Sequence, residues 1–476
     1  MNSDGINSVK DKKMKKDCIF LIFGVTGDLA KKKIIPALYE LFSEGFFNNV
    51  IIIGIARRKF SSKKILNDSK KYMKDFKKRN FNKLLKRFHY FQLNFNDSNR
   101  YNELQKFVNE IQRKHKIANK INYLSTSPEY FETIVKNLKK SEAGKKKGFN
   151  RVVFEKPFGF DYDSAKKIDN KIGKVFNEKE IFRIDHYLGK EIVKNIITLR
   201  FDNQIFRSIW NRDNIAHIQI ILAENQGIGR RGEFYDKYGA IKDVVQNHIV
   251  QLLALTLMNP PKKLDENYIR NEKIKILKKI KIEKVVLGQY KNYKNEKNVK
   301  KNSKTETFAA LKVFVNLKKW RGIPIYILTG KKLKKKITHI YIEFKKSSCY
   351  ILEEECNFEP NYLDLEIQPD EGFYLALNAR DSFKEKTVPI VMEFCHKCKF
   401  GPNTPDAYKN LFKEIIKGNQ LLFIRSDEIK QEWKIINQIE KKHLKVYVYN
   451  KRNIPDRAED LIKNDGYDWH LEINKK

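Results

Sequence analysis

The segment between residues 18 and 56 constrains the fold of this chain more than any other. Cys18–Phe23 is an apolar run of six residues ended by a glycine, the pattern of a buried strand. Leu29–Phe46 then carries apolar side chains at helical spacing, and Val50–Ala56 is a second short apolar run. A strand, a glycine turn, a helix and a strand within about 40 residues form a βαβ unit, which predicts a parallel sheet.

Three further strand candidates follow, with polar, helix-forming stretches between them: Phe88–Leu93, Asn122–Ser125 and Arg151–Phe154. Strands that alternate with helices in this way are typical of a doubly wound, Rossmann-like domain that binds a dinucleotide. We predict such an α/β domain over residues 18–200.

The pattern changes after about residue 200. Strand-like segments are now less regularly separated by helices, and they are Ile215–Ala223, Ala309–Asn316, Ile325–Leu328, Ile337–Phe344 and Leu363–Ile367. This arrangement predicts an α+β domain over residues 201–476, with a large, mostly antiparallel sheet and helices on one face. Asn271–Thr305 is rich in lysine and asparagine, and Lys291–Lys304 has almost no apolar residues, so we expect a solvated loop there.

The formal net charge of +39 has two interpretations. One is a nucleic-acid-binding protein held by contacts to phosphates. The other is a general bias toward lysine at surface positions. We favour the bias, because the lysines are spread along the whole chain instead of gathering on one element. We therefore expect no specific nucleic-acid partner, although the positive field attracts small phosphorylated molecules.

Cysteine content and hydropathy point to a cytoplasmic protein. The five cysteines give no even framework of disulfides, which fits a reducing compartment. No apolar run approaches the roughly 20 residues that cross a bilayer, so we expect no membrane partner. Cys395-His396-Lys397-Cys398 looks like half of a zinc site, but no second pair stands at a suitable spacing, and we predict no metal.

Gly24–Leu29, at the turn between the first strand and its helix, is a candidate phosphate-binding loop. Glycines let the backbone approach a pyrophosphate, whose charge is favoured by the N–H groups and dipole at the helix N-terminus. A tight turn with no ligand is the alternative. Arg57 ends the second strand, where NAD-binding domains usually carry an acid and NADP-binding domains an arginine for the 2′-phosphate. The sequence therefore favours NADP.

Lys156 lies in the segment Glu155–Gly159, directly after a predicted strand. The carboxyl end of a parallel strand is where open α/β sheets bind their ligands. By itself the segment also fits a surface lysine before a proline turn.

The densest polar cluster of the sequence is Arg183–Glu191. Its His186, Tyr187 and Lys190 can converge on one phosphate, because they supply donors of three geometries. Asp185 can orient a histidine from elsewhere in the chain, as half of an acid–base dyad. The alternative is a charged turn that leads into the next helix.

Asp243–His248 supplies that histidine, ahead of the apolar helix Ile249–Leu257. Asp243 and His248 are five residues apart, so we expect them at neighbouring angles of one helix. A lone histidine in a helix is usually structural, and that alternative stays open for the motif alone.

Together these motifs resemble the glucose-6-phosphate dehydrogenase family. The matching segments are GVTGDLAKKKIIPALY, EKPFG, RIDHYLGKE, DVVQNH, TFAALKVFV, TGK, IQP, PDAYKNL and FIRSDE. They occur in the family's order and near its spacing from about Cys18 to Trp469, and RIDHYLGKE is highly specific. The resemblance implies oxidation of glucose 6-phosphate at C1 to 6-phospho-D-glucono-1,5-lactone with hydride transfer to NADP, the first step of the oxidative pentose phosphate pathway. It also implies a homodimer or homotetramer.

The resemblance assigns roles to single residues. His248 resembles the base that takes the C1 hydroxyl proton, Asp185 its orienting partner, and Lys156 a catalytic residue that contacts substrate and nicotinamide through a loop with a cis bond to Pro157. The implied substrate ligands are Lys156, His186, Tyr187, Lys190, Glu224, Asp243, Lys331, Lys336 and Gln368. The implied coenzyme ligands are Gly24, Val25, Thr26, Gly27, Asp28, Leu29, Ala30, Lys31, Arg57, Tyr123 and Lys156.

The sequence departs from the family's animal branch, which carries a second, structural NADP on basic residues of the C-terminal domain. The matching positions here are Leu328, Ile337, Tyr341 and Glu366, none of them basic, so we expect no second NADP. Two alternatives to the dehydrogenase remain: a nucleic-acid-binding or moonlighting protein on an inactive scaffold, and a dehydrogenase of another sugar phosphate.

Overall fold

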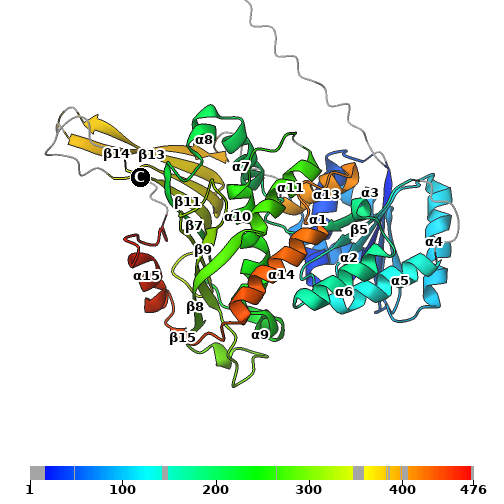
Figure 1. The fold of residues 1–476 in the computed structure, drawn as a ribbon. Coiled ribbons are helices and arrows are strands. Elements are labelled where there is room, and N and C mark those ends of the chain that lie inside the picture. The colour runs from blue at the N-terminus through cyan, green and yellow to red at the C-terminus, as the bar shows by residue number, and fades with distance from the viewer. Residues whose placement is uncertain are drawn as a thin grey trace, which may run out of the picture. The chain divides into compact units, whose positions relative to one another are not determined.

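The computed structural model describes residues 17–47, 49–141, 148–263, 265–346, 359–381, 383, 386–396, 398 and 406–472 (Figure 1). The chain divides into two compact units. The first unit comprises Met1–Phe158, Lys167–Ile184 and Tyr408–Phe423, and the second comprises Gly159–Lys166, Asp185–Ala407 and Ile424–Lys476. No helix in the described part of the chain is long and apolar enough to span a membrane.

The first unit is built on a six-stranded, fully parallel sheet with the strand order β3-β2-β1-β4-β5-β6. Its strands are β1 (Cys18–Phe23), β2 (Val50–Ala56), β3 (Phe88–Gln92), β4 (Lys120–Leu124), β5 (Asn150–Phe154) and β6 (Ile181–Arg183). Every residue of β1 and β2 is buried, which is why both read as unbroken apolar runs. The prediction of a doubly wound parallel sheet is confirmed.

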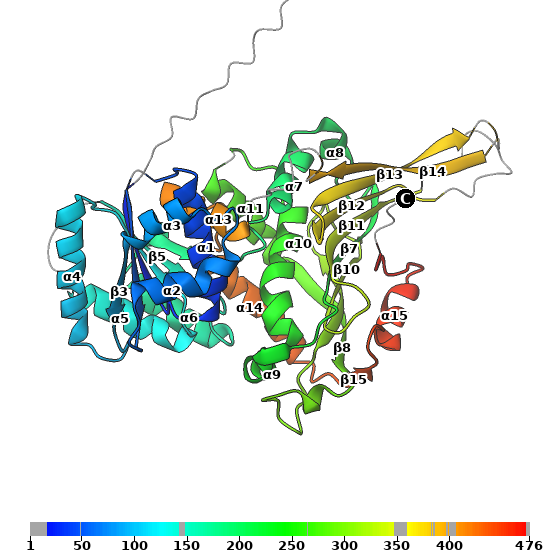
Figure 2. The ribbon, with the colours of Figure 1, turned by 180° about the vertical axis from the view of Figure 1, so that it is seen from behind.

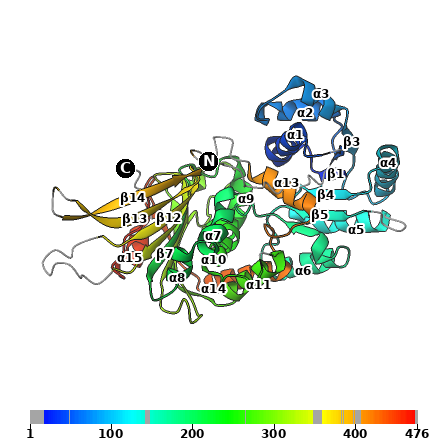
Figure 3. The same ribbon diagram turned by 90° about the horizontal axis from the view of Figure 1, so that it is seen from above.

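Helices cover both faces of this sheet. The helices α1 (Ile35–Ser43), α2 (Ser62–Ser69) and α3 (Lys78–Leu85) lie on one face, and α4 (Arg100–His115) and α5 (Phe131–Ser141) lie on the other (Figure 3). The π-helix η1 (Ala30–Ile34) precedes α1, so the predicted helix Leu29–Phe46 is η1 and α1 together. The helix α6 (Tyr162–Gly173) spans the division between the two units.

A helix from far along the chain completes the first unit. Phe412, on α13 (Ala407–Lys417), packs its ring 5.8 Å from Phe20 of β1 and 5.5 Å from Tyr123 of β4. On the same helix, Lys409 approaches Glu40 of α1 at 3.9 Å. Residues 408–423 therefore fold as part of the first unit, although they follow most of the second unit in sequence.

The second unit contains a nine-stranded sheet with the order β14-β13-β12-β11-β7-β10-β9-β8-β15. Its strands are β7 (Ile215–Ala223), β8 (Ile280–Tyr290), β9 (Phe308–Val315), β10 (Ile325–Gly330), β11 (Ile337–Phe344), β12 (Tyr362–Gln368), β13 (Gly372–Asp381), β14 (Lys386–Cys395) and β15 (Val446–Tyr449). Only the β7–β10 and β8–β15 pairs are parallel. The predicted mostly antiparallel sheet is confirmed.

Helices lie on both faces of this second sheet, and the expectation of helices on one face is wrong. On one side lie α7 (Glu191–Phe201), α9 (Gly232–Ala240) and α10 (Val250–Leu257), whereas α15 (Asp456–Lys463) packs on β8 and β9 from the other (Figure 2). The remaining helices of this unit include α8 (Gln204–Ile209), α11 (Glu266–Leu277), α14 (Ser426–Glu440) and the π-helix η6 (Ile241–Ile249). All eight residues of α10 are buried.

The prediction of a solvated loop over Asn271–Thr305 is wrong for its first half. That half holds the end of α11 and the whole of β8. Lysines there alternate with isoleucines, and Ile274, Ile276 and Ile280 are buried, while the lysines other than Lys273 between them are exposed. A lysine-rich composition hid an amphipathic pattern. From Lys291 to Thr305 the chain is irregular apart from the short turn η7 (Tyr293–Asn295).

Candidate active site

A buried histidine–aspartate pair lies at the centre of the candidate site in the second unit. Nδ1 of His248 is 2.5 Å from Oδ1 of Asp185, and the two residues are 3% and 1% exposed. They are 63 positions apart in sequence, and the structure brings them together as the motifs predict. A proton on Nδ1 donates to Asp185, which leaves the lone pair of Nε2 as the acceptor.

His248 is carried by the π-helix η6, and a glycine break precedes that helix. Gly239 has φ +65°, a conformation that side chains other than glycine rarely adopt, and it interrupts the helical path between α9 and η6. The N–H of Ile241 then donates to Glu306 Oε1 at 3.0 Å, which caps the new helix. A π-helix closes its backbone hydrogen bonds between residues i and i+5. Asp243 and His248 are five residues apart on this helix, so they lie at neighbouring angles, as the sequence predicts.

The turn before α7 presents aromatic side chains to His248. Asp185 Oδ1 accepts the N–H of Tyr187 at 2.9 Å, so the carboxylate that faces His248 also fixes the turn. The rings of His186 and Tyr187 lie 4.7 and 4.4 Å from the His248 ring. Burial raises the pKa of Tyr187, so its hydroxyl, 3.4 Å from Thr338 Oγ1, stays protonated and neutral.

Lys190 extends from the same turn toward the end of β12. Its Nζ donates to the carbonyl of Ile367 at 3.2 Å and lies 3.9 Å from Oε1 of Glu371. Gln368, half-buried, is the last residue of β12 and pairs with Thr338 in the sheet register. The structure therefore brings Lys190 and Gln368 to the same end of the strand.

Two further predicted substrate ligands are held by partners of opposite charge. Glu224, just after β7, hydrogen-bonds to Lys331, which follows β10, and these strands are neighbours. Asp243 accepts from the guanidinium of Arg231 at 3.1 and 3.2 Å. Lys336 is exposed immediately before β11, and no contact described for it joins it to the His248 cluster.

The predicted coenzyme loop lines a hollow of about 370 Å³ in the first unit. Gly24 has φ +83°, and a Cβ atom there would lie 2.3 Å from the carbonyl oxygen of Ser125. Only glycine lets the chain pass so close to the end of β4. The hollow is lined by Gly24, Thr26, Gly27, Ala56, Arg57, Arg58, Asn94, Phe95, Ser125, Thr126, Ser127 and Tyr130. Arg57 is exposed at its rim.

The other predicted coenzyme ligands lie around this loop in different environments. Val25 is buried and packs where Gly54 of β2 leaves room, so its side chain is structural. Lys31 lies 3.8 Å from Asp68. Asp28 accepts from Lys32 at 2.8 Å, Leu29 is half-buried, and Ala30 is buried at the start of η1.

Tyr123 and Lys156 lie at the ends of β4 and β5. Tyr123 is fully buried, and its hydroxyl donates to Glu155 at 2.5 Å, so it does not line the hollow described above. Lys156 is half-buried and is joined to Pro157 by a cis peptide bond, as the resemblance implies. Glu155 thus links the two predicted ligands, because its side chain accepts from Tyr123 and it directly precedes Lys156 in the chain.

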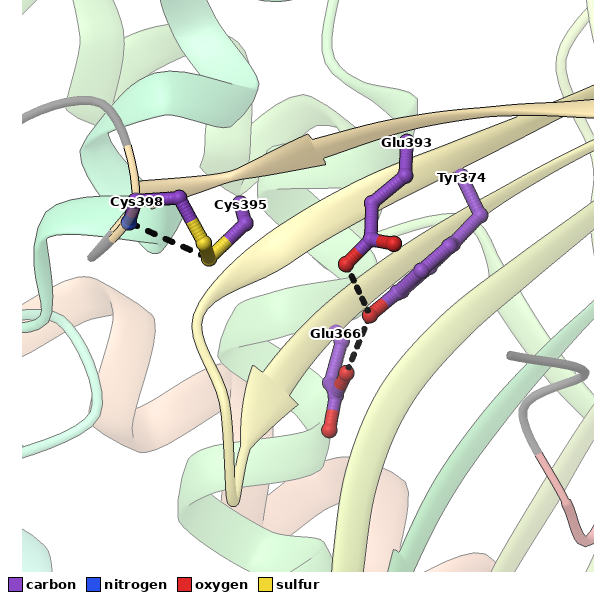
Figure 4. The surroundings of a disulfide bond; sticks show 5 residues. All are labelled: Glu366, Tyr374, Glu393, Cys395 and Cys398. Carbon is purple, nitrogen blue, oxygen red and sulfur yellow. Dashed lines mark hydrogen bonds between the residues drawn. A yellow bond between two sulfur atoms is a disulfide. The ribbon is translucent and has the colours of Figure 1, made fainter. Parts of the chain in front are cut away.

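Among the described residues, Asp185, His186 and His248 present potential metal-ligating atoms within 4.8 Å of one another. The hydrogen bond between Asp185 and His248 accounts for part of this closeness. Cys395 and Cys398 form a disulfide at the end of β14, where the sequence indicated no disulfide framework (Figure 4). Sulfurs bonded to each other are not zinc thiolates. The absence of a metal stays a prediction.

The four positions that match the animal branch's second NADP site are all buried: Leu328, Ile337, Tyr341 and Glu366. Glu366 accepts from the hydroxyl of Tyr374 at 3.1 Å, and the same hydroxyl lies 3.3 Å from Glu393 (Figure 4). A hollow of about 370 Å³ beside Tyr341 is lined by further carboxylates, including Glu343 and Glu393. Such a lining repels a 2′-phosphate.

Several residues around the site were not found from the sequence. Arg231 holds Asp243, Glu371 lies beside Lys190, and Glu306 caps η6. Each is a single charged residue in a segment with no recognisable motif. Only the three-dimensional pairing shows that they belong to the site.

The first unit has the parallel sheet and glycine turn of a dinucleotide-binding domain, and the second carries a buried histidine–aspartate pair. Together these features define the class of nicotinamide-dependent dehydrogenases. Two family models match consecutive parts of the chain. "Glucose-6-phosphate dehydrogenase, NAD binding domain" matches residues 21–195, and "Glucose-6-phosphate dehydrogenase, C-terminal domain" matches residues 197–470. The chain belongs to the glucose-6-phosphate dehydrogenase family.

Individual relatives agree over nearly the whole length. The glucose-6-phosphate 1-dehydrogenase of Chlamydia muridarum is 37% identical over 489 aligned residues, covering 95% of this chain and 96% of the relative. Glucose-6-phosphate 1-dehydrogenase 5, cytoplasmic, of Arabidopsis thaliana is 36% identical, covering 94% and 91%. A solved structure of glucose-6-phosphate dehydrogenase in complex with its substrate glucose 6-phosphate superposes with a TM-score of 0.89 at 31% identity, covering 96% and 99%.

Proposed function

We propose that this protein oxidises glucose 6-phosphate at C1 to 6-phospho-D-glucono-1,5-lactone, with NADP as the hydride acceptor. The observation that carries the proposal is the buried pair of His248 and Asp185, with a phosphate-binding type of cluster beside it. The relatives described above bear the name of this activity, which supports the choice of substrate.

His248 acts as the general base. Its Nδ1 faces Asp185, so Nε2 takes the proton from the C1 hydroxyl while the C1–H bond breaks and C1 becomes a carbonyl carbon. The imidazolium that forms is stabilised by the Asp185 carboxylate at 2.5 Å. When bound, the coenzyme supplies a nicotinamide ring that accepts the hydride.

The first unit fits a dinucleotide by its own geometry. A Cβ atom at Gly24 would fill the space beside Ser125, and the adjoining hollow has room for part of a ligand. Backbone N–H groups of the turn suit the pyrophosphate, and the guanidinium of Arg57 suits a 2′-phosphate. The choice of NADP over NAD rests on Arg57. Lys156, at the end of β5, contacts substrate and nicotinamide in this proposal.

His186, Tyr187 and Lys190 bind the sugar phosphate. They follow one another on a turn whose backbone Asp185 fixes, so one half of the dyad and the phosphate site lie within the same six residues. The remaining substrate contacts are proposed for Glu224, Asp243, Lys331, Lys336 and Gln368. Binding energy at the phosphate then positions C1 at His248.

We also propose that the protein works in the cytoplasm as a homodimer or homotetramer. The cytoplasmic Arabidopsis relative supports the location. The alternative of a nucleic-acid-binding or moonlighting protein on an inactive scaffold has no support among the relatives, and the intact dyad argues against it.

The experiment that tests this function is absorbance at 340 nm with glucose 6-phosphate and NADP, for the wild type and for His248→Ala. We expect kcat to fall roughly 10²- to 10⁴-fold, with a smaller effect on KM, because the base acts in the transition state. His115→Ala, which alters a histidine at the end of α4, serves as control and should keep wild-type rates. A folded His248→Ala protein whose kcat stays within a few-fold of the wild-type value rules out His248 as the general base. Stronger activity with another sugar phosphate rules out the substrate.

A further inference from the structure

A fully buried polar network lies directly behind the helix that carries His248. Glu428 and Glu432, one turn apart on α14, are both 0% exposed. They meet Gln246 of η6, Gln251 of α10 and Lys273 of α11, which are 3%, 0% and 1% exposed. Buried charges at this depth are uncommon and costly unless they are paired.

The two carboxylates of this network share the amide of Gln251, 3.2 Å from Glu428, but differ in their other partners. Glu428 lies 2.7 Å from the ammonium of Lys273, so it has a cation. Glu432 accepts the amide of Gln246 at 3.0 Å and the amide of Gln251 at 2.5 Å. Among the described residues, the polar contacts of Glu432 are these two amides. One lysine therefore serves two buried acids, and it pairs with Glu428.

Charge balance favours an uncharged Glu432. An ionised carboxylate held only by amides in a dry interior costs several kcal/mol, whereas a carboxylic acid does not. The amide of Gln246 can turn over and accept its proton, whereas that of Gln251 is held, because its Oε1 accepts from Lys273 at 2.6 Å. Burial raises the pKa of Glu432 well above its usual range, and the carboxylates of Glu428 and Asp185 raise it further, against the opposing effects of Gln251 and Lys273. No titratable side chain of η6 or α10 contacts Glu432 among the described hydrogen bonds. Where α14 meets β8, the N–H of Ile282 donates to the uncharged side chain of Gln438 at 3.3 Å.

The connection to the active site is short. Gln246 precedes His248 by two residues on the same π-helix, and Gln251 follows it by three. Glu432 holds both amides, one through each carboxyl oxygen, so it clamps the backbone on both sides of the histidine. Asp185 is close enough to act on the Glu432 carboxyl electrostatically.

We propose that Glu432 is a positioning residue for the base, an uncharged acid that clamps the His248 helix through Gln246 and Gln251 and leaves Asp185 as the anion that stabilises the imidazolium. The role in turnover rests on the proposed function. A second anion behind the helix would raise the basicity of His248 and disturb the transfer of the proton back to solvent.

The kinetic test compares Glu432→Gln, an uncharged analogue that keeps both hydrogen bonds, with Glu432→Leu, which removes the hydrogen bond to residue 432 from both amides. Glu432→Gln should keep kcat at pH 7 within about two-fold of the wild type. Glu432→Leu should lose roughly 10-fold or more in kcat while KM for glucose 6-phosphate stays within about three-fold, because a displaced base affects the chemical step and not the phosphate site. Equal losses in both variants, or full activity of Glu432→Leu, overturn the proposal.

A melting experiment needs no turnover and so tests Glu432 even where the wild type fails to oxidise glucose 6-phosphate. A carboxyl whose folded pKa is raised stabilises the protein fully below its unfolded pKa, about 4.3, and loses that contribution as pH rises. The melting temperature of Glu432→Gln should therefore rise relative to the wild type between pH 5 and 9. A difference that is flat or falls with pH contradicts an uncharged Glu432. Glu428→Gln is the matched control: it strips Lys273 of its anionic partner and should be destabilised at every pH in that range.

Discussion

Nδ1 of His248 and Oδ1 of Asp185 meet at 2.5 Å in an almost wholly buried pocket of the second unit. At that depth the attraction between imidazolium and carboxylate is screened far less than in water. The same carboxylate oxygen accepts the N–H of Tyr187, so it cannot rotate away from the histidine without releasing the turn that we propose to bind the phosphate. In the proposed function, proton acceptance and substrate positioning are thus linked through one oxygen atom.

Asp185→Asn should lower kcat by roughly 10²- to 10⁴-fold, with KM for glucose 6-phosphate changed by a few-fold at most. The amide keeps the size of the side chain but removes the charge that stabilises the imidazolium. Steady-state kinetics against pH measures the effect.

The chain contains a matched control for this substitution. His339 and Asp364 form a second buried pair, with Nδ1 and Oδ1 2.8 Å apart and both residues 0% exposed. Asp364→Asn should lower the melting temperature but leave kcat of the folded enzyme near the wild-type value. Equal kinetic losses in the two variants would mean that Asp185 acts only through stability.

Lys190→Ala tests the phosphate site. The substitution should raise KM for glucose 6-phosphate and also lower kcat, because phosphate binding energy positions C1 at the base. Glucose without its phosphate gains nothing from Lys190, so its slow oxidation should be nearly unchanged. Lys194→Ala, one helical turn further on and paired with Glu191 at 3.1 Å, is the control of equal charge. A variant that loses equally on both sugars shows that Lys190 does not serve the phosphate.

The glutamate that caps the His248 helix should make stability depend on pH. Burial raises the pKa of Glu306 to about 7, although the N–H of Ile241 opposes the shift. Because the folded pKa lies above the unfolded value near 4.3, the contribution of Glu306 is complete at low pH and is lost as pH rises toward 7.

Glu306→Gln removes this titration. The free energy of unfolding of Glu306→Gln, compared with that of the wild type, should rise by about 1–3 kcal/mol between pH 4.5 and 7.5 and then level off. Denaturant unfolding at a series of pH values measures it. Glu233→Gln, exposed on α9, should show no such trend. A constant difference between Glu306→Gln and the wild type would place the Glu306 pKa in its ordinary range.

The first unit was predictable because its strands are buried on both sides. A continuous apolar run such as Cys18–Phe23 indicates a fully buried strand. The glycine turn and helix that follow it indicate a parallel connection to the next strand. The second unit was less predictable. At the start of β8, the exposed Lys281 and Glu283 alternate with the buried Ile280 and Ile282, and composition alone suggested a loop. Nothing in sequence shows that residues 408–423 fold with the N-terminal sheet, since that depends on the fit of Phe412 between Phe20 and Tyr123.

The site divides in the same way. Motifs brought out His248, Asp185 and Lys190, since each lies in a polar cluster next to a regular element. The acids behind them were invisible, because Glu432 reads as one more charged residue of a helix until three other helices bury it. Long-range pairing, not local pattern, decides which charged residues enter the interior.

The last prediction concerns the choice of coenzyme. Arg57 is exposed at the rim of the hollow beside the glycine turn, and a guanidinium–phosphate contact contributes about 1.5–3 kcal/mol, or roughly 10- to 150-fold in affinity. Arg57→Ala should raise KM for NADP by such a factor and leave KM for NAD, which has no 2′-phosphate, nearly unchanged.

The positive field of the whole chain also favours the more negative coenzyme, and it must be separated from the contact. Lys59→Ala removes the same charge two residues away, outside the lining of the hollow, so it measures the field alone. Long-range attraction fades as ionic strength rises, whereas a short paired contact fades less. The effect of Arg57→Ala should therefore persist at high salt, and that of Lys59→Ala should vanish. If the two variants change the NADP/NAD preference equally at both salt concentrations, Arg57 does not bind the 2′-phosphate, and the lysines of the following helix, Lys31 to Lys33, become the candidates.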